Sequence, residues 1–256
     1  MWKRVLVATG FNLLFEYSMR GVNNLQIQPI LPLALFITYF TLFTMLDDLI
    51  SRYSLRDFHL IVVAFSYGMI YQCLVSGAAF LPPLFLGMNW RSIFFVILVW
   101  WGALQNIMTF YLANRVSPRT HNGSKLSRRG WIIALSLNTA MIWMFQGSGQ
   151  IPRGTMLGYS IMSLVATLSV LLSVGILKGY ERSSHPQFTK SRFMDLLSLS
   201  TIIIFFSCAS FLTFDSGRYG ASNINWAATR VIVPWTTFVA VVMLAYRLFS
   251  KKPIPV

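Results

Sequence analysis

Long runs without a formal charge alternate with short basic segments along most of the chain. A helix that crosses a bilayer needs about 20 mostly apolar residues, and most of these runs are long enough. The pattern therefore predicts an all-α fold, a polytopic integral membrane helical bundle that forms a single membrane domain over residues 1–256. The eight transmembrane helices are expected near residues 5–23, 29–47, 59–79, 92–113, 131–147, 156–177, 195–214 and 226–247.

Composition and charge agree with this class and add an orientation. Hydrophobic residues make up 55% of the chain and charged residues 11%, and the net charge is +14, whereas soluble domains carry about 25% charged residues. Cytoplasmic loops of membrane proteins carry an excess of Lys and Arg, so both termini are expected inside a plasma (cell inner) membrane. With eight spans and a cytoplasmic N-terminus, 16 of the 21 Lys and Arg are cytoplasmic, and the outer side keeps Arg20, Arg91, Arg153, Arg218 and Arg230.

The same basic loops define the expected partners. They are predicted to lie against the anionic headgroups of the lipid bilayer, and no nucleic-acid partner is expected. Three histidines and two cysteines without metal-ligand spacing predict no metal site and no cofactor. No catalytic residues are assigned, because no histidine lies at membrane depth to serve a serine nucleophile.

One polar stripe runs along the first predicted span. Its residues recur at spacings of three and four, which places them on one helix face. An isolated charge at the bilayer centre costs about 2.5–3.5 kcal/mol, so the stripe is expected to face protein or water. Either Glu16 and Arg20 pair with each other and serve packing, or they form a binding or gating site. The stripe consists of Thr9, Asn12, Glu16, Arg20 and Asn23.

Further charged residues surround the start of the last predicted span. Arginine suits the binding of anions because its planar guanidinium offers several donors. These residues and the stripe together predict an outer-half ligand site for a small molecule. The predicted ligand-binding residues are Asn12, Glu16, Arg20, Asp215, Arg218 and Arg230.

Two adjacent acids end the second predicted span, where negative charge opposes the helix dipole. Asp47 and Asp48 are followed by Arg52, four residues beyond Asp48. Two interpretations remain open for Asp47, Asp48 and Arg52: a local salt-bridge network at headgroup level, or an inner gate.

Two weaker signals complete the pattern. Gln105, Asn106 and Asn138 are expected to make interhelical hydrogen bonds, or to line a path through the bundle. Residues 80–90, FLPPLFLGMNW, are apolar but interrupted by proline and glycine, and are expected to lie at the outer interface or to dip into the membrane, with Trp90 as an interfacial anchor.

Three classes of function are compatible with this pattern. The first is binding or transport of a small solute, anionic or lipid-derived, through the outer-half site, with Glu16 coupling binding to protonation. The second is a non-catalytic membrane subunit or receptor that docks a partner through its basic cytoplasmic loops. The third is a membrane-embedded lipid-modifying enzyme in which Glu16 acts as general acid or base.

Overall fold

The predicted all-α class is confirmed. The computed structural model describes residues 1–119, 125–148, 152–179, 188–211, 226–250 and 254, and no strand occurs among them. The helices are α1 (Trp2–Arg20), α2 (Asn24–Ile27), α3 (Leu31–Tyr53), α4 (Asp57–Leu74), η1 (Ala78–Phe80), α5 (Trp90–Phe95), η2 (Val96–Met108), α6 (Thr109–Val116), α7 (Arg128–Gly147), α8 (Met156–Gly179), α9 (Arg192–Phe211) and α10 (Trp226–Ser250).

Within the described ranges, six helices are long and apolar enough to cross a membrane, as expected of an integral membrane protein, when α5, η2 and α6 are taken as one continuous helix. Two further helices, α1 and α7, coincide with the remaining predicted spans but fall outside this group of six. Helix α1 contains four charged side chains, and α7 begins with two arginines. The six helices are Leu31–Tyr53, Asp57–Leu74, Trp90–Val116, Met156–Ile176, Arg192–Phe211 and Ala227–Ser250.

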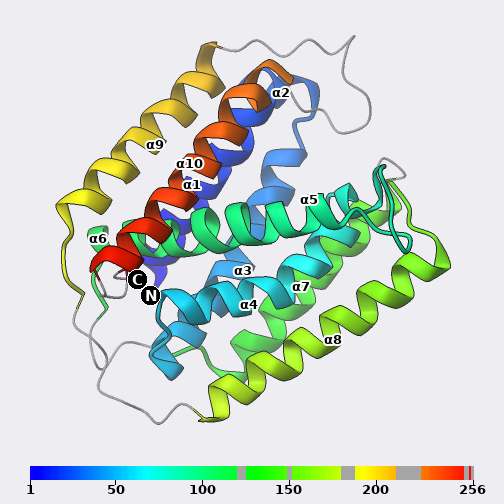
Figure 1. The fold of residues 1–256 in the computed structure, drawn as a ribbon, viewed down its shortest axis with the longest axis horizontal. Coiled ribbons are helices and arrows are strands. Elements are labelled where there is room, and N and C mark those ends of the chain that lie inside the picture. Colours follow the sequence, from blue (N-terminus) through cyan, green and yellow to red (C-terminus); the bar gives the residue numbers. More distant parts are fainter. Residues whose placement is uncertain (120–124, 149–151, 180–187, 212–225, 251–253, 255–256) are drawn as a thin grey trace.

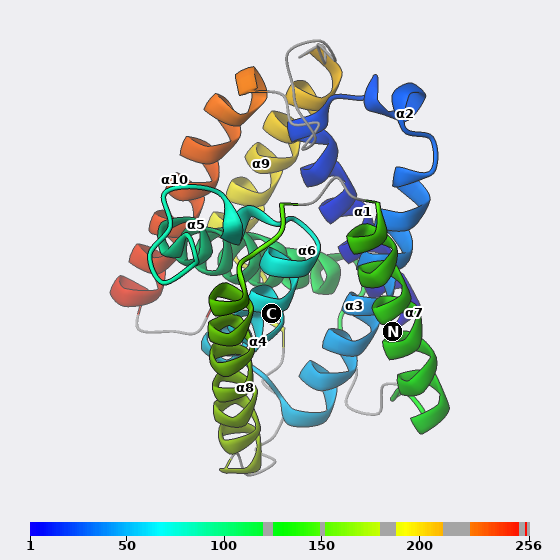
Figure 2. The ribbon, with the colours of Figure 1, turned by 90° about the vertical axis from the view of Figure 1, so that its right-hand side faces the viewer.

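Helix α1 lies at the centre of one group of helices. It packs against α3, α6, α9 and α10, and Figure 1 shows α1, α9 and α10 running side by side. A second group forms around α4, which packs against η2 and α8. Figure 2 shows α7 and α8 on different sides of the molecule, where α7 packs on α3 and α8 on α4.

The two groups are joined by one continuous helix made of α5, η2 and α6. Its middle part, η2, is wound as a π-helix, and the backbone N–H of Thr109 donates to the carbonyl of Leu104, five residues earlier. The side chains of Leu104, Met108 and Tyr111 are fully buried along this helix. π-Helical segments are rare and often occur at functional sites. The polar residues of η2 are therefore candidates for a functional site.

Candidate functional site

Glu16 and Arg20 form an ion pair near the C-terminal end of α1. The Nε of Arg20 lies 3.3 Å from Oε2 of Glu16, and the two side chains are 18% and 16% exposed respectively. The hydroxyl of Tyr39 on α3 donates to the other carboxylate oxygen of Glu16. The carboxylate is therefore held by two partners and remains partly accessible.

A chain of hydrogen bonds continues from this pair into the protein. The side-chain amide of Gln105 donates to the hydroxyl of Tyr39 over 3.2 Å. Tyr39 and Gln105 are both buried, at 3% and 2% exposure. Side-chain contacts thus connect Arg20, through Glu16 and Tyr39, with Gln105 on η2; we call this set the Glu16 chain.

The π-helical segment directs three polar side chains toward three different helices. Gln105 reaches Tyr39 on α3, and Asn106 donates to the hydroxyl of Tyr67 on α4 over 2.7 Å. Thr109, immediately after the segment, accepts a 3.0 Å hydrogen bond from the side-chain amide of Asn12 on α1. A polar centre made of Asn12, Gln105, Asn106 and Thr109 therefore lies where α1, α3 and α4 meet η2.

The polar centre contains acceptors that no donor among the described residues reaches. The side-chain oxygens of Asn12 and Asn106 are buried and have no hydrogen-bond partner, and neither does the nearby hydroxyl of Thr9 on α1. Buried polar groups nearly always have partners in proteins, so each of these atoms needs an explanation. Polar atoms of this kind can be satisfied by a ligand or by water.

Asn138 on α7, by contrast, is fully used as an interhelical clamp. Its oxygen accepts from the hydroxyl of Tyr71 on α4 over 2.6 Å. Its amide donates to the hydroxyl of Thr41 over 3.0 Å and to the carbonyl of Thr38 over 3.2 Å, both on α3. These bonds assign Asn138 to packing of α7, in keeping with one of its two expected roles.

Asp47 is the centre of a buried charge cluster at the other end of α1. It is 1% exposed and accepts two 3.0 Å bonds from the guanidinium of Arg4 and one 2.8 Å bond from Arg119. The guanidinium of Arg119 also lies over the ring of Phe110, 5.4 Å from its centroid. Burial lowers the pKa of Arg119, although Asp47 opposes this shift.

Asp48 joins α3 to α7 beside this cluster. Its carboxylate accepts from the backbone N–H of Leu126 over 2.8 Å and from Nε1 of Trp131 over 2.7 Å. It also pairs with Arg52, the partner that the spacing of four residues predicts. The cluster of Asp47, Asp48 and their partners thus holds together the start of α1, the end of α3 and the start of α7.

The other predicted site residues are not gathered around Glu16 in the described structure. Arg230 is exposed on α10, and Asp215 and Arg218 lie outside the described residues. Asn12 shares the face of Glu16, but its hydrogen bonds go to Thr109 and to its own helix. Of the six predicted ligand-binding residues, the structure brings only Glu16 and Arg20 into direct contact with each other, among those that it describes.

Sequence reasoning missed the tyrosine and the arginines that complete these sites. Tyr39 is one of ten tyrosines, and no local spacing connects it with Glu16. Arg4 and Arg119 lie 43 and 72 positions from Asp47. The sequence could indicate only that a buried acid such as Asp47 needs a cationic partner, and not which residue supplies it.

No group of three or more His, Cys, Asp or Glu side chains that could hold a metal ion occurs in the described part of the chain. The chain matches no protein-family model, no curated protein and no solved structure. Its function is therefore inferred from the geometry of the polar groups.

Proposed function

We propose that the protein is an eight-span membrane protein with both termini in the cytoplasm, which binds a small anionic or lipid-derived solute at Glu16 and Arg20 and moves it across the membrane. The eight-span part of the proposal adds α1 and α7 to the six apolar helices. Ion pairs between helix ends support it, because each joins ends that the eight-span topology puts on the cytoplasmic side. Asp47 joins α1 to α3, Asp57 on α4 pairs with Arg247 on α10, and Arg115 on α6 pairs with Asp195 on α9.

The Glu16 chain is the observation that carries the binding part of the proposal. Ionisable residues in membrane-spanning helices are functional candidates by default, since they are costly to insert. Here a partly exposed acid and its arginine are connected through Tyr39 to the polar centre on a π-helical segment. An accessible charged pair backed by under-satisfied polar atoms favours a solute site with a route deeper into the bundle.

The Asp47 and Asp48 cluster would close the cytoplasmic end of that route. The buried carboxylate of Asp47 pairs with Arg4 on α1 and with Arg119, and a hydrogen bond from Trp131 to Asp48 adds α7, so the cluster connects three helices as an inner gate requires. The alternative function, docking of a partner through the basic cytoplasmic loops, gains less support. Some of the basic residues at the cytoplasmic side form ion pairs within the protein. Arg52, Arg115 and Arg119 pair with Asp48, Asp195 and Asp47.

Ligand-induced stabilisation tests the binding site. A ligand present at 100 times its Kd raises the free energy of unfolding by about 2.7 kcal/mol. We expect at least one compound among phosphate, sulfate, small carboxylates and glycerol phosphate to raise the melting temperature of the purified protein. Arg20→Gln should abolish this response, whereas Arg115→Gln, which removes a partly exposed ion pair between α6 and α9, should keep it.

Two results would count against the site. One is a wild-type protein whose melting temperature responds to none of these compounds. The other is an equal response in the Arg20→Gln and Arg115→Gln variants, which would place binding elsewhere in the molecule.

A further inference from the structure

The segment between η1 and α5 presents apolar side chains at the surface. Leu84, Phe85 and Leu86 are 46%, 69% and 51% exposed. Figure 1 shows this segment next to the ends of α4, α5 and α8. Helix α2, which follows α1, lies in a different part of the molecule. Burying apolar side chains of this size removes them from water and is favourable, so the exposed group offers a contact surface to an apolar molecule.

Hydrogen bonds hold this segment in one shape. The backbones of Phe85 and Met88 bond to each other in both directions, at 2.9 and 3.1 Å. The amide of Asn89 donates to the carbonyl of Leu81 over 2.9 Å, and Nε1 of Trp90 donates to the carbonyl of Phe85 over 3.0 Å. The exposed apolar side chains are therefore displayed by a fixed backbone.

Close packing against α8 fixes the segment from the other side. A Cβ added at Gly158 on α8 would lie 2.7 Å from the carbonyl oxygen of Gly87, and Gly87 has a φ of +75°. The two backbones meet without side chains between them. The segment is thus anchored on one of the six membrane-length helices.

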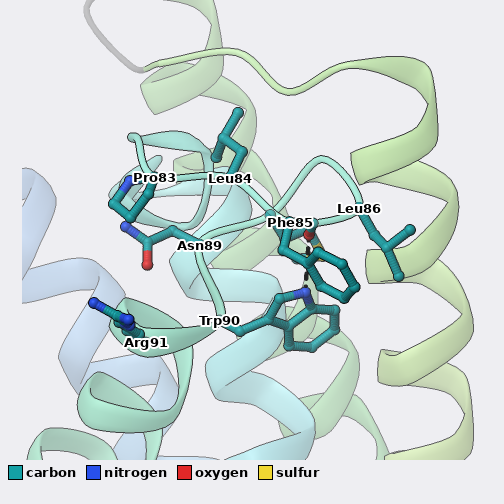
Figure 3. A pocket seen from close by; sticks show the side chains of 8 residues that line it. Pro83, Leu84, Phe85, Leu86, Asn89, Trp90 and Arg91 are labelled. Carbon is teal, nitrogen blue, oxygen red and sulfur yellow. Dashed lines mark hydrogen bonds between the residues drawn. The ribbon is translucent and has the colours of Figure 1, made fainter.

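The segment encloses an open cavity of about 480 Å³ with two kinds of wall. In Figure 3, Asn89 and Arg91 lie on one side of the group, and Phe85, Leu86 and Trp90 on the other. Arg91 is exposed. Each acid in the described part of the chain pairs with an arginine other than Arg91. The cavity therefore combines an apolar wall with a cation that these acids do not neutralise.

We propose that this cavity binds an anionic phospholipid, with its phosphate at Arg91 and its acyl chain along the apolar side chains. Arginine binds phosphate through paired donors, and tryptophan with basic residues is typical of the membrane interface. The cavity lies where α4 ends and α5 begins, at the ends of two membrane-length helices. The proposal needs only that these helices span a bilayer, and it does not depend on the Glu16 site.

Fluorescence quenching tests the site with the full-length protein in phosphatidylcholine bilayers. The probe is phosphatidylglycerol with brominated acyl chains, and brominated phosphatidylcholine is the reference lipid. The difference in emission between the wild type and Trp90→Phe isolates the signal of Trp90 within the cavity. A basic residue near a membrane surface contributes about 1 kcal/mol to anionic lipid binding, so half-quenching should need about fivefold less phosphatidylglycerol than phosphatidylcholine.

The variants assign this preference to the cavity. Arg91→Gln should abolish it, whereas Arg153→Gln, at another exposed arginine beside α8, should retain it. Native mass spectrometry gives a second readout that does not need the Trp90→Phe variant. The Arg91→Gln protein should retain one bound phosphatidylglycerol molecule fewer than the wild type. Glycerol phosphate in solution should leave the quenching unchanged, because the acyl chain supplies much of the contact.

Three results would overturn the proposal. These are equal quenching of the wild type by the two lipids, a preference that survives Arg91→Gln, and displacement of the lipid by glycerol phosphate. The last result would assign the cavity to a soluble phosphate compound.

Discussion

We expect Asp47→Asn to lower the free energy of unfolding by about 3–5 kcal/mol, because it removes one partner from a buried ion pair. The carboxylate is 1% exposed and pairs with both Arg4 and Arg119, whose side chains are 5% and 15% exposed. Without it, these two guanidinium groups have no acid between them. Unfolding in mixed micelles with increasing dodecyl sulfate, followed by circular dichroism, measures the loss.

Asp195→Asn provides the matched control for this prediction. Its ion pair with Arg115 has a similar length, 3.0 Å, but the two side chains are 35% and 40% exposed. Exposed pairs contribute at most about 1 kcal/mol, so this variant should unfold nearly as the wild type does. Equal losses in the two variants would show that burial of the Asp47 cluster does not matter for stability.

The second large effect concerns the negative charge of Glu16. In the wild type, the carboxylate competes with an anionic solute for Arg20. Glu16→Gln removes the negative charge and should bind a compound that passes the melting screen about tenfold more tightly, a change of about 1.4 kcal/mol. Titration calorimetry with the wild type and the variant measures this gain in affinity.

The size of this effect follows from the distance and the exposure of the pair. Two unit charges 4 Å apart near a protein surface interact by about 4 kcal/mol, and partial exposure of Glu16 and Arg20 reduces this value. Among the described residues, the side chains that bond to the carboxylate are Arg20 and the hydroxyl of Tyr39.

Tyr39→Phe tests whether the acid itself is responsible. This variant removes the hydroxyl that contacts Glu16 but keeps the carboxylate, so its affinity for the compound should stay near that of the wild type. An equal gain in affinity in Tyr39→Phe would assign the effect to the lost hydrogen bond and not to the charge. A Glu16→Gln protein that does not fold would show that the pair serves packing.

The sequence predicted those features that depend on local spacing or on composition. Hydrophobic runs located the helices, although α3 continues to Tyr53, beyond the predicted end at residue 47. The spacing of four residues placed Glu16 beside Arg20 and Asp48 beside Arg52, and both ion pairs are present. Such pairs form within one helix, so they need no knowledge of the tertiary structure.

Features that depend on how distant segments meet could not be predicted. The contact of Tyr39 with Glu16 depends on the packing of α3 against α1, and the cluster at Asp47 needs a residue beyond α6. The hydrophobic residues over 92–113 show no periodicity that would distinguish the π-helix η2 from an α-helix. For residues 80–90, the structure shows a hydrogen-bonded segment anchored on α8, with Leu84, Phe85 and Leu86 exposed, and its position in the membrane stays a prediction.

Thiol labelling of Asn12→Cys tests most directly whether solutes reach the polar centre. The variant is made with Cys73→Ala and Cys208→Ala, and a membrane-impermeant reagent is added from the outside. Asn12 is fully buried in this structure, as is Met69 in the apolar packing around α4, so Met69→Cys is the matched control. A solute route through Glu16 predicts that Asn12→Cys is labelled much faster than Met69→Cys. Equal protection of both thiols in the folded protein would contradict it, and would leave Glu16 and Arg20 as a pair that only holds helices together.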